Sequence, residues 1–234
     1  MSSYLRQKYQ AGKYILQKEG LLPLVTEVIR LLRKCVFVHE RYFMYEMPLN
    51  EPMKYEAAPK IPGFVFEIVP TNQRLNELAA LGFDFGIHGI RAQEKLDKGA
   101  LMFCIFIGKE LASIHWAAVN QEAANTLVNG IVYRKGLSNN EAYLGWSVTN
   151  PRYRRLGLSI YLSSEKQRLL KAMGKTTLRW MTEKGNLASR KLTIKTGGMI
   201  YAEARYLKIL WWKSWKEKPA IQQADSPNLS RRPE

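Results

Sequence analysis

Short apolar segments separated by turn residues fill the middle of the chain. Residues 64–70 are rich in Phe, Val and Ile and partly alternate, which predicts a strand, and Thr71 can then cap a short helix. Two longer apolar runs, residues 100–107 and 111–119, lie on either side of a Gly-Lys-Glu turn. Two such runs around a short polar turn predict a hairpin.

Strand and helix patterns then alternate. Residues 143–148 predict a strand, residues 156–171 carry apolar positions at helical spacing, and residues 176–182 predict another strand. A second helix is expected after Asn186, and residues 199–212 predict two more short strands. This order favours a mixed sheet with helices packed on it.

A different pattern lies ahead of this region. Within residues 20–40 one side of a helix would be apolar and the opposite side would be mostly basic. The apolar positions are Leu21, Leu24, Val25, Val28, Leu32, Cys35 and Val36, and the polar ones are Glu27, Arg30, Arg33 and Lys34. Three roles are open for this amphipathic helix: packing on the rest of the chain, contact with a second copy in a homodimer, or peripheral contact with an anionic membrane through residues 21–36.

Proline and polar composition suggest the division of the chain. Residues 47–63 hold four of the ten prolines and predict an extended linker. The end of the chain is polar, which is typical of a disordered tail. We therefore expect a helical arm and linker over residues 1–60, a folded domain over residues 61–214 and a tail over residues 215–234.

Composition narrows the class of protein. With 234 residues, 46% apolar and 11% aromatic, the chain can bury a sizeable core. Cys35 and Cys104 form neither a disulfide framework nor a zinc motif, and His39, His88 and His115 are scattered, so we expect no metal site. The first residues lack the uninterrupted apolar segment typical of a secretion signal, and no run of eighteen apolar residues occurs, so we expect a cytoplasmic protein.

Positive charge is concentrated in one region. The net charge is +16, and residues 151–200 hold twelve Lys or Arg against two Glu, whereas residues 61–150 hold seven basic against eight acidic residues. Such a field attracts phosphate groups. Lys166, Lys171 and Lys175 are expected to be surface lysines on a solvated face. A nucleic-acid partner is disfavoured because no known nucleic-acid-binding motif accompanies the charge.

The basic region begins with a motif suited to phosphate. Three arginines, Arg152, Arg154 and Arg155, precede Gly157 and the start of the predicted helix. A helix start offers backbone N–H groups without partners inside the helix, and its dipole attracts anions. Glycine lets the backbone approach the anion closely, and arginine pairs with phosphate. The segment therefore predicts a phosphate-binding loop.

Two spaced segments together resemble a known family. The pattern Arg154-x-x-Gly157-x-Ser159 is followed, 27 residues after Ser159, by Asn186-x-x-Ser189. With Gly197, these residues resemble the GNAT superfamily of acyl-CoA-dependent N-acetyltransferases over roughly residues 64–212. The resemblance implies an α/β (α+β) fold with a mixed, mostly antiparallel central sheet flanked by helices, here preceded by the N-terminal amphipathic helical arm.

Two positions depart from the family pattern. Thr193 stands where many members carry a tyrosine that protonates the leaving thiolate, and Gly198 stands where an aromatic residue usually follows the glycine.

The resemblance implies direct attack of an amine on the thioester of acetyl-CoA or another acyl-CoA. The residues expected to bind the CoA co-substrate are Trp146, Val148, Arg154, Arg155, Leu156, Gly157, Leu158, Ser159, Ile160, Asn186 and Ser189. A backbone amide around residues 146–148 would bind the oxyanion. Glu141 is the first candidate for the general base and His115 the alternative, while Ser189 could protonate the leaving group.

The acceptor amine is not identified by the sequence. Residues 126–140 lie where family members diversify the acceptor cleft. A second interpretation is a GNAT-like domain that binds CoA or another anion without turnover, as a binding or membrane-surface module, because the tyrosine expected at position 193 is absent.

Overall fold

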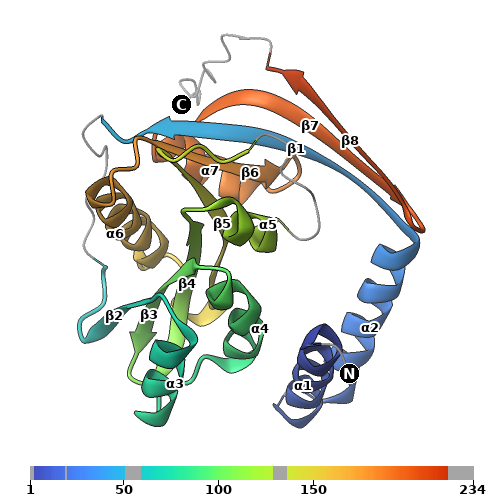
Figure 1. The fold of residues 1–234 in the computed structure, drawn as a ribbon. Helices are drawn as coiled ribbons and strands as arrows, with labels where there is room; N and C mark the ends of the chain where they lie inside the picture. Colours follow the sequence, from blue (N-terminus) through green and yellow to red (C-terminus); the bar gives the residue numbers. More distant parts are fainter. Residues whose placement is uncertain (1–2, 19, 51–58, 129–135, 221–234) are drawn as a thin grey trace, which may run out of the picture.

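One sheet organises the computed structural model, which describes residues 3–18, 20–50, 59–128 and 136–220. In this part of the chain eight strands follow the order β2-β3-β4-β5-β6-β1-β7-β8 (Figure 1). The strands are β1 (Phe37–Pro48), β2 (Phe64–Val69), β3 (Ala100–Ile107), β4 (Glu110–Ala118), β5 (Glu141–Thr149), β6 (Thr177–Glu183), β7 (Met199–Ile209) and β8 (Trp212–Pro219). Neighbours pair antiparallel except β5 and β6, which are parallel. The predicted mixed, mostly antiparallel sheet is confirmed.

Helices cover both faces of this sheet. The helices of the described residues are α1 (Ser3–Lys18), α2 (Leu21–Val36), α3 (Asn72–Ala80), α4 (Gly86–Asp97), α5 (Gln121–Leu127), α6 (Leu158–Ala172) and α7 (Leu187–Lys195). Helices α3, α4 and α5 share one hydrophobic cluster with the sheet, and α6 forms a second cluster on the opposite face. The α6 helix contacts β3, β4 and β5.

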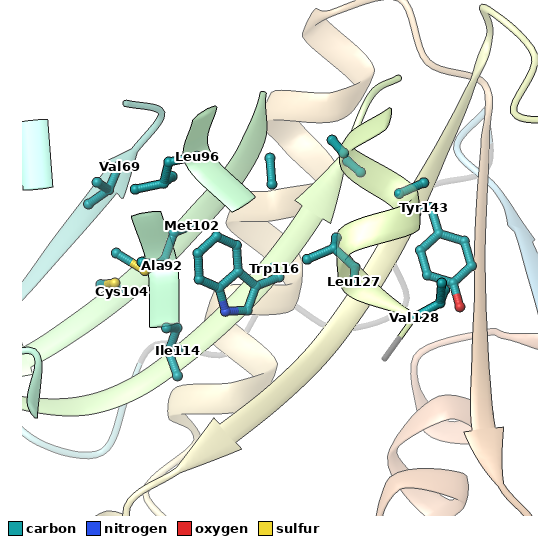
Figure 2. Packing of buried hydrophobic residues seen from close by; sticks show 14 of the residues in the cluster. Val69, Ala92, Leu96, Met102, Cys104, Ile114, Trp116, Leu127, Val128 and Tyr143 are labelled. Atoms are coloured by element: carbon teal, nitrogen blue, oxygen red, sulfur yellow. The ribbon is translucent and has the colours of Figure 1, made fainter. Parts of the chain in front are cut away.

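Strand β3 shows why the sequences of the central strands are continuously apolar. Met102 and Cys104 belong to the cluster under α4, whereas Phe103 and Ile105 belong to the cluster under α6. Alternate side chains of a strand point to opposite faces, so a strand covered on both faces is apolar throughout. Figure 2 shows the first cluster, in which the buried Trp116 of β4 lies close to Leu127 of α5.

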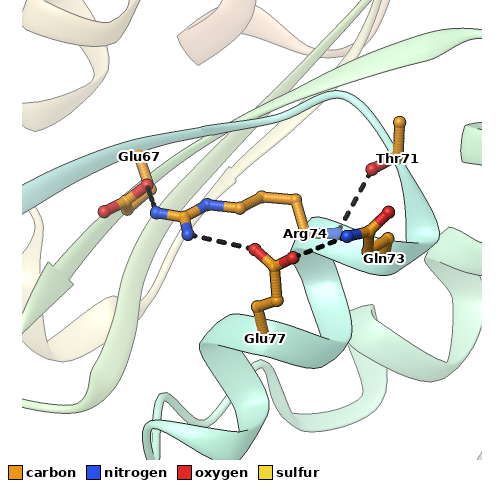
Figure 3. A network of polar contacts seen from close by, with 5 residues as sticks. All are labelled: Glu67, Thr71, Gln73, Arg74 and Glu77. Atoms are coloured by element: carbon orange, nitrogen blue, oxygen red, sulfur yellow. Dashed lines mark hydrogen bonds and ion pairs between the residues drawn. The ribbon is translucent and has the colours of Figure 1, made fainter.

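The start of α3 follows the sequence prediction. The Thr71 hydroxyl accepts a hydrogen bond from the Arg74 backbone N–H at 3.2 Å, as a cap should. The Arg74 guanidinium lies between Glu67 of β2, at 2.9 Å, and Glu77, at 3.3 Å (Figure 3). These contacts join the helix to the edge strand.

Strand β1 corrects the prediction of a helical arm and linker over residues 1–60. Residues 37–48 pair with β6 on one side and with β7 on the other, so they lie inside the sheet. Both partner strands are more than a hundred residues away in the sequence, so no local pattern could place β1 between them. The predicted boundary at residue 60 therefore cuts through the sheet, and whether residues 1–36 form a separate unit stays a prediction.

The C-terminal strands are longer than predicted. Strands β7 and β8 form a hairpin that runs to Pro219, so residues 215–219, assigned to the tail, are strand. Residues 221–234 lie outside the described residues. Helices α4 and α5 were also missed, although the Asn120 side chain caps α5 by accepting the Ala123 N–H at 2.8 Å.

The two N-terminal helices differ in burial. Helix α1 contacts α4 and buries Ile15, so this helix packs on the domain. Helix α2 leaves several apolar side chains exposed, among them Leu21, Leu22 and Val25. Among the described helices none is long and apolar enough to span a bilayer. Contact with a membrane surface or a second copy through residues 21–36 stays a prediction.

Candidate functional site

Strands β5 and β6 diverge in the middle of the sheet. They pair only over three positions, from Glu141 opposite Thr177 to Tyr143 opposite Arg179. Beyond Tyr143, β5 continues to Thr149 and pairs with β4 alone. One side of the β5 backbone over residues 144–149 therefore has no neighbouring strand.

A β-bulge lies in this segment. Ala117 pairs with Leu144 but His115 pairs with Ser147, so Gly145 and Trp146 together lie opposite Trp116. A Cβ on Gly145 would stand 2.9 Å from the Trp116 Cβ, closer than side chains tolerate. Glycine is therefore required at this position. A bulge turns the backbone locally and leaves polar groups outside the strand ladder.

The connection after β5 is fixed by hydrogen bonds. A short 3-10 turn, Pro151–Tyr153, is capped by Asn150, whose side chain accepts the Arg152 N–H at 3.1 Å. The Tyr153 hydroxyl donates to Glu110 of β4 at 2.6 Å, and Asn150 donates to the same carboxylate at 3.0 Å. These contacts hold the loop against the end of the sheet.

The loop itself has the conformation of an anion site. Arg155 and Gly157 both have positive φ, 66° and 82°, and Gly157 is the N-cap of α6 without a side-chain cap. The N–H groups of Leu158 and Ser159 in the first turn therefore have no partner within the helix. The helix dipole adds partial positive charge at the same point. The structure thus brings the predicted loop residues 154–160 together at one helix start.

Two arginines stand beside these N–H groups. The side chains of Arg154 and Arg155 are exposed, and neither forms an ion pair with a described residue. Arg152 instead lies 3.8 Å from Glu110 and over the Tyr153 ring. Arg154 and Arg155 are therefore the cations placed to contact a phosphate bound at the loop.

Glu141 lies far from this loop. It is buried at the start of β5, its carboxylate is 2.8 Å from the Arg179 guanidinium, and it accepts the Ser138 N–H at 3.1 Å. Six residues of extended strand, about 20 Å, separate it from Ser147. This geometry favours a structural ion pair over the predicted role as general base.

His115 lies under α6. Its Nε2 is 3.0 Å from the Ser159 hydroxyl, so it connects β4 to the first turn of the helix. Burial lowers the pKa of His115 well below its usual value, with a smaller effect from Lys166, and the imidazole is neutral at pH 7. His115 is enclosed and in contact with the loop helix, so it is suited to position Ser159.

Lys166 corrects the prediction of a solvated lysine face. It follows Leu158 and Leu162 on the inner side of α6 and is only 5% exposed. Burial lowers its pKa from 10.5 to about 8. Lys171 is exposed as expected, whereas the Lys175 ammonium donates to the carbonyls of Val119 and Asn139.

Replacing Lys166 by Met should stabilise the protein at pH 7 by about 3 kcal/mol, since a lowered pKa of this size measures the cost of burying the charge. Below pH 8 both folded and unfolded chains carry the proton and the cost is complete. Between pH 8 and 10.5 the unfolded chain binds more protons, so wild-type stability rises and the gain from Lys166→Met shrinks. Urea unfolding of wild type and Lys166→Met at pH 7 and pH 10 measures this difference in the free energy of unfolding. Lys171→Met should change stability by less than about 0.5 kcal/mol at either pH.

The second predicted segment caps α7. The Asn186 side chain accepts the Ser189 N–H at 3.1 Å, and the Ser189 hydroxyl lies 3.3 Å from the Thr182 hydroxyl of β6. Ser189 is partly exposed and Asn186 is exposed, so the Asn186 amide nitrogen is free to contact a ligand while its oxygen caps the helix.

Trp180 of β6 explains the two departures from the family pattern. Its indole N–H donates to the Thr193 hydroxyl at 3.1 Å, and Thr193 is buried. A Cβ on Gly198 would meet the same indole ring at 2.5 Å, so the tryptophan occupies the space beside the glycine. Thr193 therefore has a structural partner, and nothing in its geometry gives it the function of a tyrosine.

A cavity of about 320 Å³ lies on the other face of the sheet, beside the end of β5. It is lined by Tyr14, Asp84, Phe85, Gly86, Ile87, His88, Glu110, Leu111, Ala112, Ser113, Ile114, Val148, Asn150 and Pro151. Val148 of β5, which the sequence predicted near the thioester, therefore also lines this cavity. Part of the predicted acceptor segment 126–140 lies outside the described residues.

Sequence reasoning missed that His88 lines this cavity, because it considered His88 only as a possible metal ligand. No local signal marks His88, since its neighbours in the site come from four other elements. Among the described residues, no group of three or more His, Cys, Asp or Glu could hold a metal ion.

Comparisons with known proteins identify the fold. No protein-family model and no curated protein sequence matches the chain. A tandem GNAT protein from the clavulanic acid biosynthesis pathway matches with a TM-score of 0.50 and 12% identity, over 76% of this chain and 53% of that one. This similarity shows the GNAT fold.

Two further solved structures are similar to the chain. A GCN5-related N-acetyltransferase from Kribbella flavida has a TM-score of 0.46 and 11% identity, over 77% of this chain and 63% of that one. An acetyltransferase of the GNAT family from Colwellia psychrerythraea has a TM-score of 0.46 and 13% identity, over 74% and 56%. The chain thus spans between half and two thirds of the length of these three structures.

Proposed function

We propose that this chain, which has the GNAT fold, transfers an acetyl or other acyl group from acyl-CoA to an amine. The observation that carries the proposal is the loop between β5 and α6, where two backbone positions of positive φ, a helix start without a side-chain cap and two exposed arginines come together. A helix start of this kind binds phosphate with little rearrangement.

The loop would hold the pyrophosphate of CoA. Backbone N–H groups of Gly157, Leu158 and Ser159 would donate to its oxygens, whereas the Ile160 N–H already donates to the Gly157 carbonyl at 3.1 Å. Arg154 or Arg155 would add charge-assisted hydrogen bonds. His115 of β4 supports this arrangement, since its hydrogen bond to the Ser159 hydroxyl fixes the first turn of α6. The local excess of ten positive charges over residues 151–200 would raise the rate of CoA association.

The β5 segment beyond Tyr143 would hold the reacting end of acyl-CoA. Its backbone pairs with β4 alone, so N–H groups on the open side can donate to a thioester oxygen. Such a donor stabilises the negative charge of a tetrahedral intermediate. Trp146 and Val148 would contact the acyl group, and Asn186 and Ser189 would contact pantetheine from the α7 side.

The leaving group does not require a tyrosine. A thiol has a pKa near 8.5, so CoA leaves as a thiolate that takes its proton from water or from a nearby hydroxyl. Ser189 is the hydroxyl proposed for this step, because it is partly exposed and belongs to the α7 start.

The test is thiol release. Mixing the full chain with acetyl-CoA and a panel of small amines should produce free CoA together with an N-acetylated amine, detected by a thiol reagent and by mass spectrometry. Tight acetyl-CoA binding without any product would favour the alternative, a CoA-binding module that does not turn over. Absence of both binding and product would contradict the proposal and its alternative together.

A further inference from the structure

The cavity beside β5 is a place where an acceptor could bind. Its walls come from α1, from the start of α4, and from the facing ends of β4 and β5. Its volume of about 320 Å³ is at the lower end of the range for small-molecule sites. Such a cavity suits a small amine better than a folded protein surface.

His88 is the imidazole in this cavity. It lies in the first turn of α4, and its ring centroid is 5.5 Å from that of Trp146, in the bulged part of β5. Its Nδ1 atom is buried, and its side chain makes no hydrogen bond with a described residue. The ring therefore lies beside Trp146, a residue of the proposed thioester site, and no described residue bonds to its nitrogens.

The other acidic or basic candidates are already engaged. Among the cavity-lining carboxylates, Asp84 accepts the Gly86 N–H at 2.7 Å and Glu110 accepts from Tyr153 and Asn150. Glu141 is paired with Arg179 at the far end of β5, and His115 is enclosed under α6.

We propose that the cavity binds a small primary amine as its ammonium and that His88 takes a proton from it before the nitrogen attacks the thioester. The inference rests on the proposed acyl transfer. The ammonium gives one proton to His88, and the nitrogen lone pair forms the new C–N bond. The C–S bond breaks, the thiolate leaves with its electron pair, and the second N–H proton passes to water. The products are the amide and CoA, and His88 then releases its proton to solvent.

Electrostatics at His88 agree with this role. Burial lowers its pKa, and the positive charge of Arg91 on the same helix lowers it further, so the imidazole is neutral and able to accept a proton at pH 7. The other titratable groups facing the cavity are Tyr14 from α1, Asp84 before α4 and Glu110 from β4. The two carboxylates would attract an ammonium group.

The experiment compares His88→Gln with wild type in the full chain, using acetyl-CoA and the best amine from the thiol-release panel. We expect kcat/KM to fall about 100-fold at pH 7 while the affinity for CoA stays within about twofold. In wild type the slope of log kcat/KM against pH should change at the pKa of His88, below 6.5, and in His88→Gln this change should disappear. Free imidazole should restore part of the activity of His88→Ala.

The control is His39→Gln, an exposed histidine on β1, which should retain wild-type activity and pH profile. Equal melting temperatures of wild type and His88→Gln exclude a folding defect. If His88→Gln is unstable, the rescue of His88→Ala by imidazole tests the role of His88 instead. Unchanged kcat/KM and an unchanged pH profile in His88→Gln would overturn the inference about His88 alone. A wild-type protein that acetylates no amine would overturn the proposed function instead.

Discussion

Replacing Gly157 by Val should lower the affinity for CoA at least about 100-fold. Gly157 has φ of 82° at the N-cap of α6, a conformation that a β-branched residue adopts only with strain. A side chain here would also keep the pyrophosphate from the N–H groups of the first turn. Losing about two charge-assisted hydrogen bonds, each contributing about 1.5–3 kcal/mol, gives an effect of this size. Isothermal titration calorimetry with CoA measures it.

The control separates strain from binding. Gly174 follows the other end of α6, has φ of 77°, and has open space where a Cβ would lie. Gly174→Val should therefore cost similar stability, about 1–3 kcal/mol, and leave CoA affinity within about twofold. Wild-type affinity in Gly157→Val would show that CoA binds elsewhere. A loss of affinity in both variants would assign the effect to helix strain.

Replacing Glu141 by Gln should destabilise the fold by about 3 kcal/mol. The change leaves the Arg179 guanidinium buried without its closest counter-charge, and breaking a buried ion pair from one side typically costs about 3–5 kcal/mol. The lower end of that range applies because Glu46 remains 3.6 Å from Arg179. Urea unfolding followed by circular dichroism provides the measurement.

Glu122→Gln is the matched control, because the pair of Glu122 with Lys98 is exposed and should contribute less than about 1 kcal/mol. The double variant Glu141→Leu with Arg179→Met should recover part of the lost stability, since an apolar pair leaves no buried charge. If Glu141→Gln instead keeps wild-type stability but loses turnover with a shifted pH profile, Glu141 is the base after all, as the sequence alone first suggested.

The sequence by itself was enough for elements whose signals are local. The alternation of apolar residues, the Thr71 cap and the Gly-Lys-Glu turn predicted β2, α3 and the β3–β4 hairpin, because strand periodicity and caps are properties of neighbouring residues. The helix start after Gly157 was likewise readable, since it is set by consecutive residues. Its role as an anion site stays a prediction.

Only the tertiary structure decided what depends on distant pairing. It placed β1 between β6 and β7, buried Lys166 under α6, and paired Glu141 with Arg179 at the far end of β5. It also brought His88 against Trp146. The sequence shows the type and charge of these side chains, but their partners lie on other elements. The pKa and the role of a side chain follow from the groups that surround it after folding.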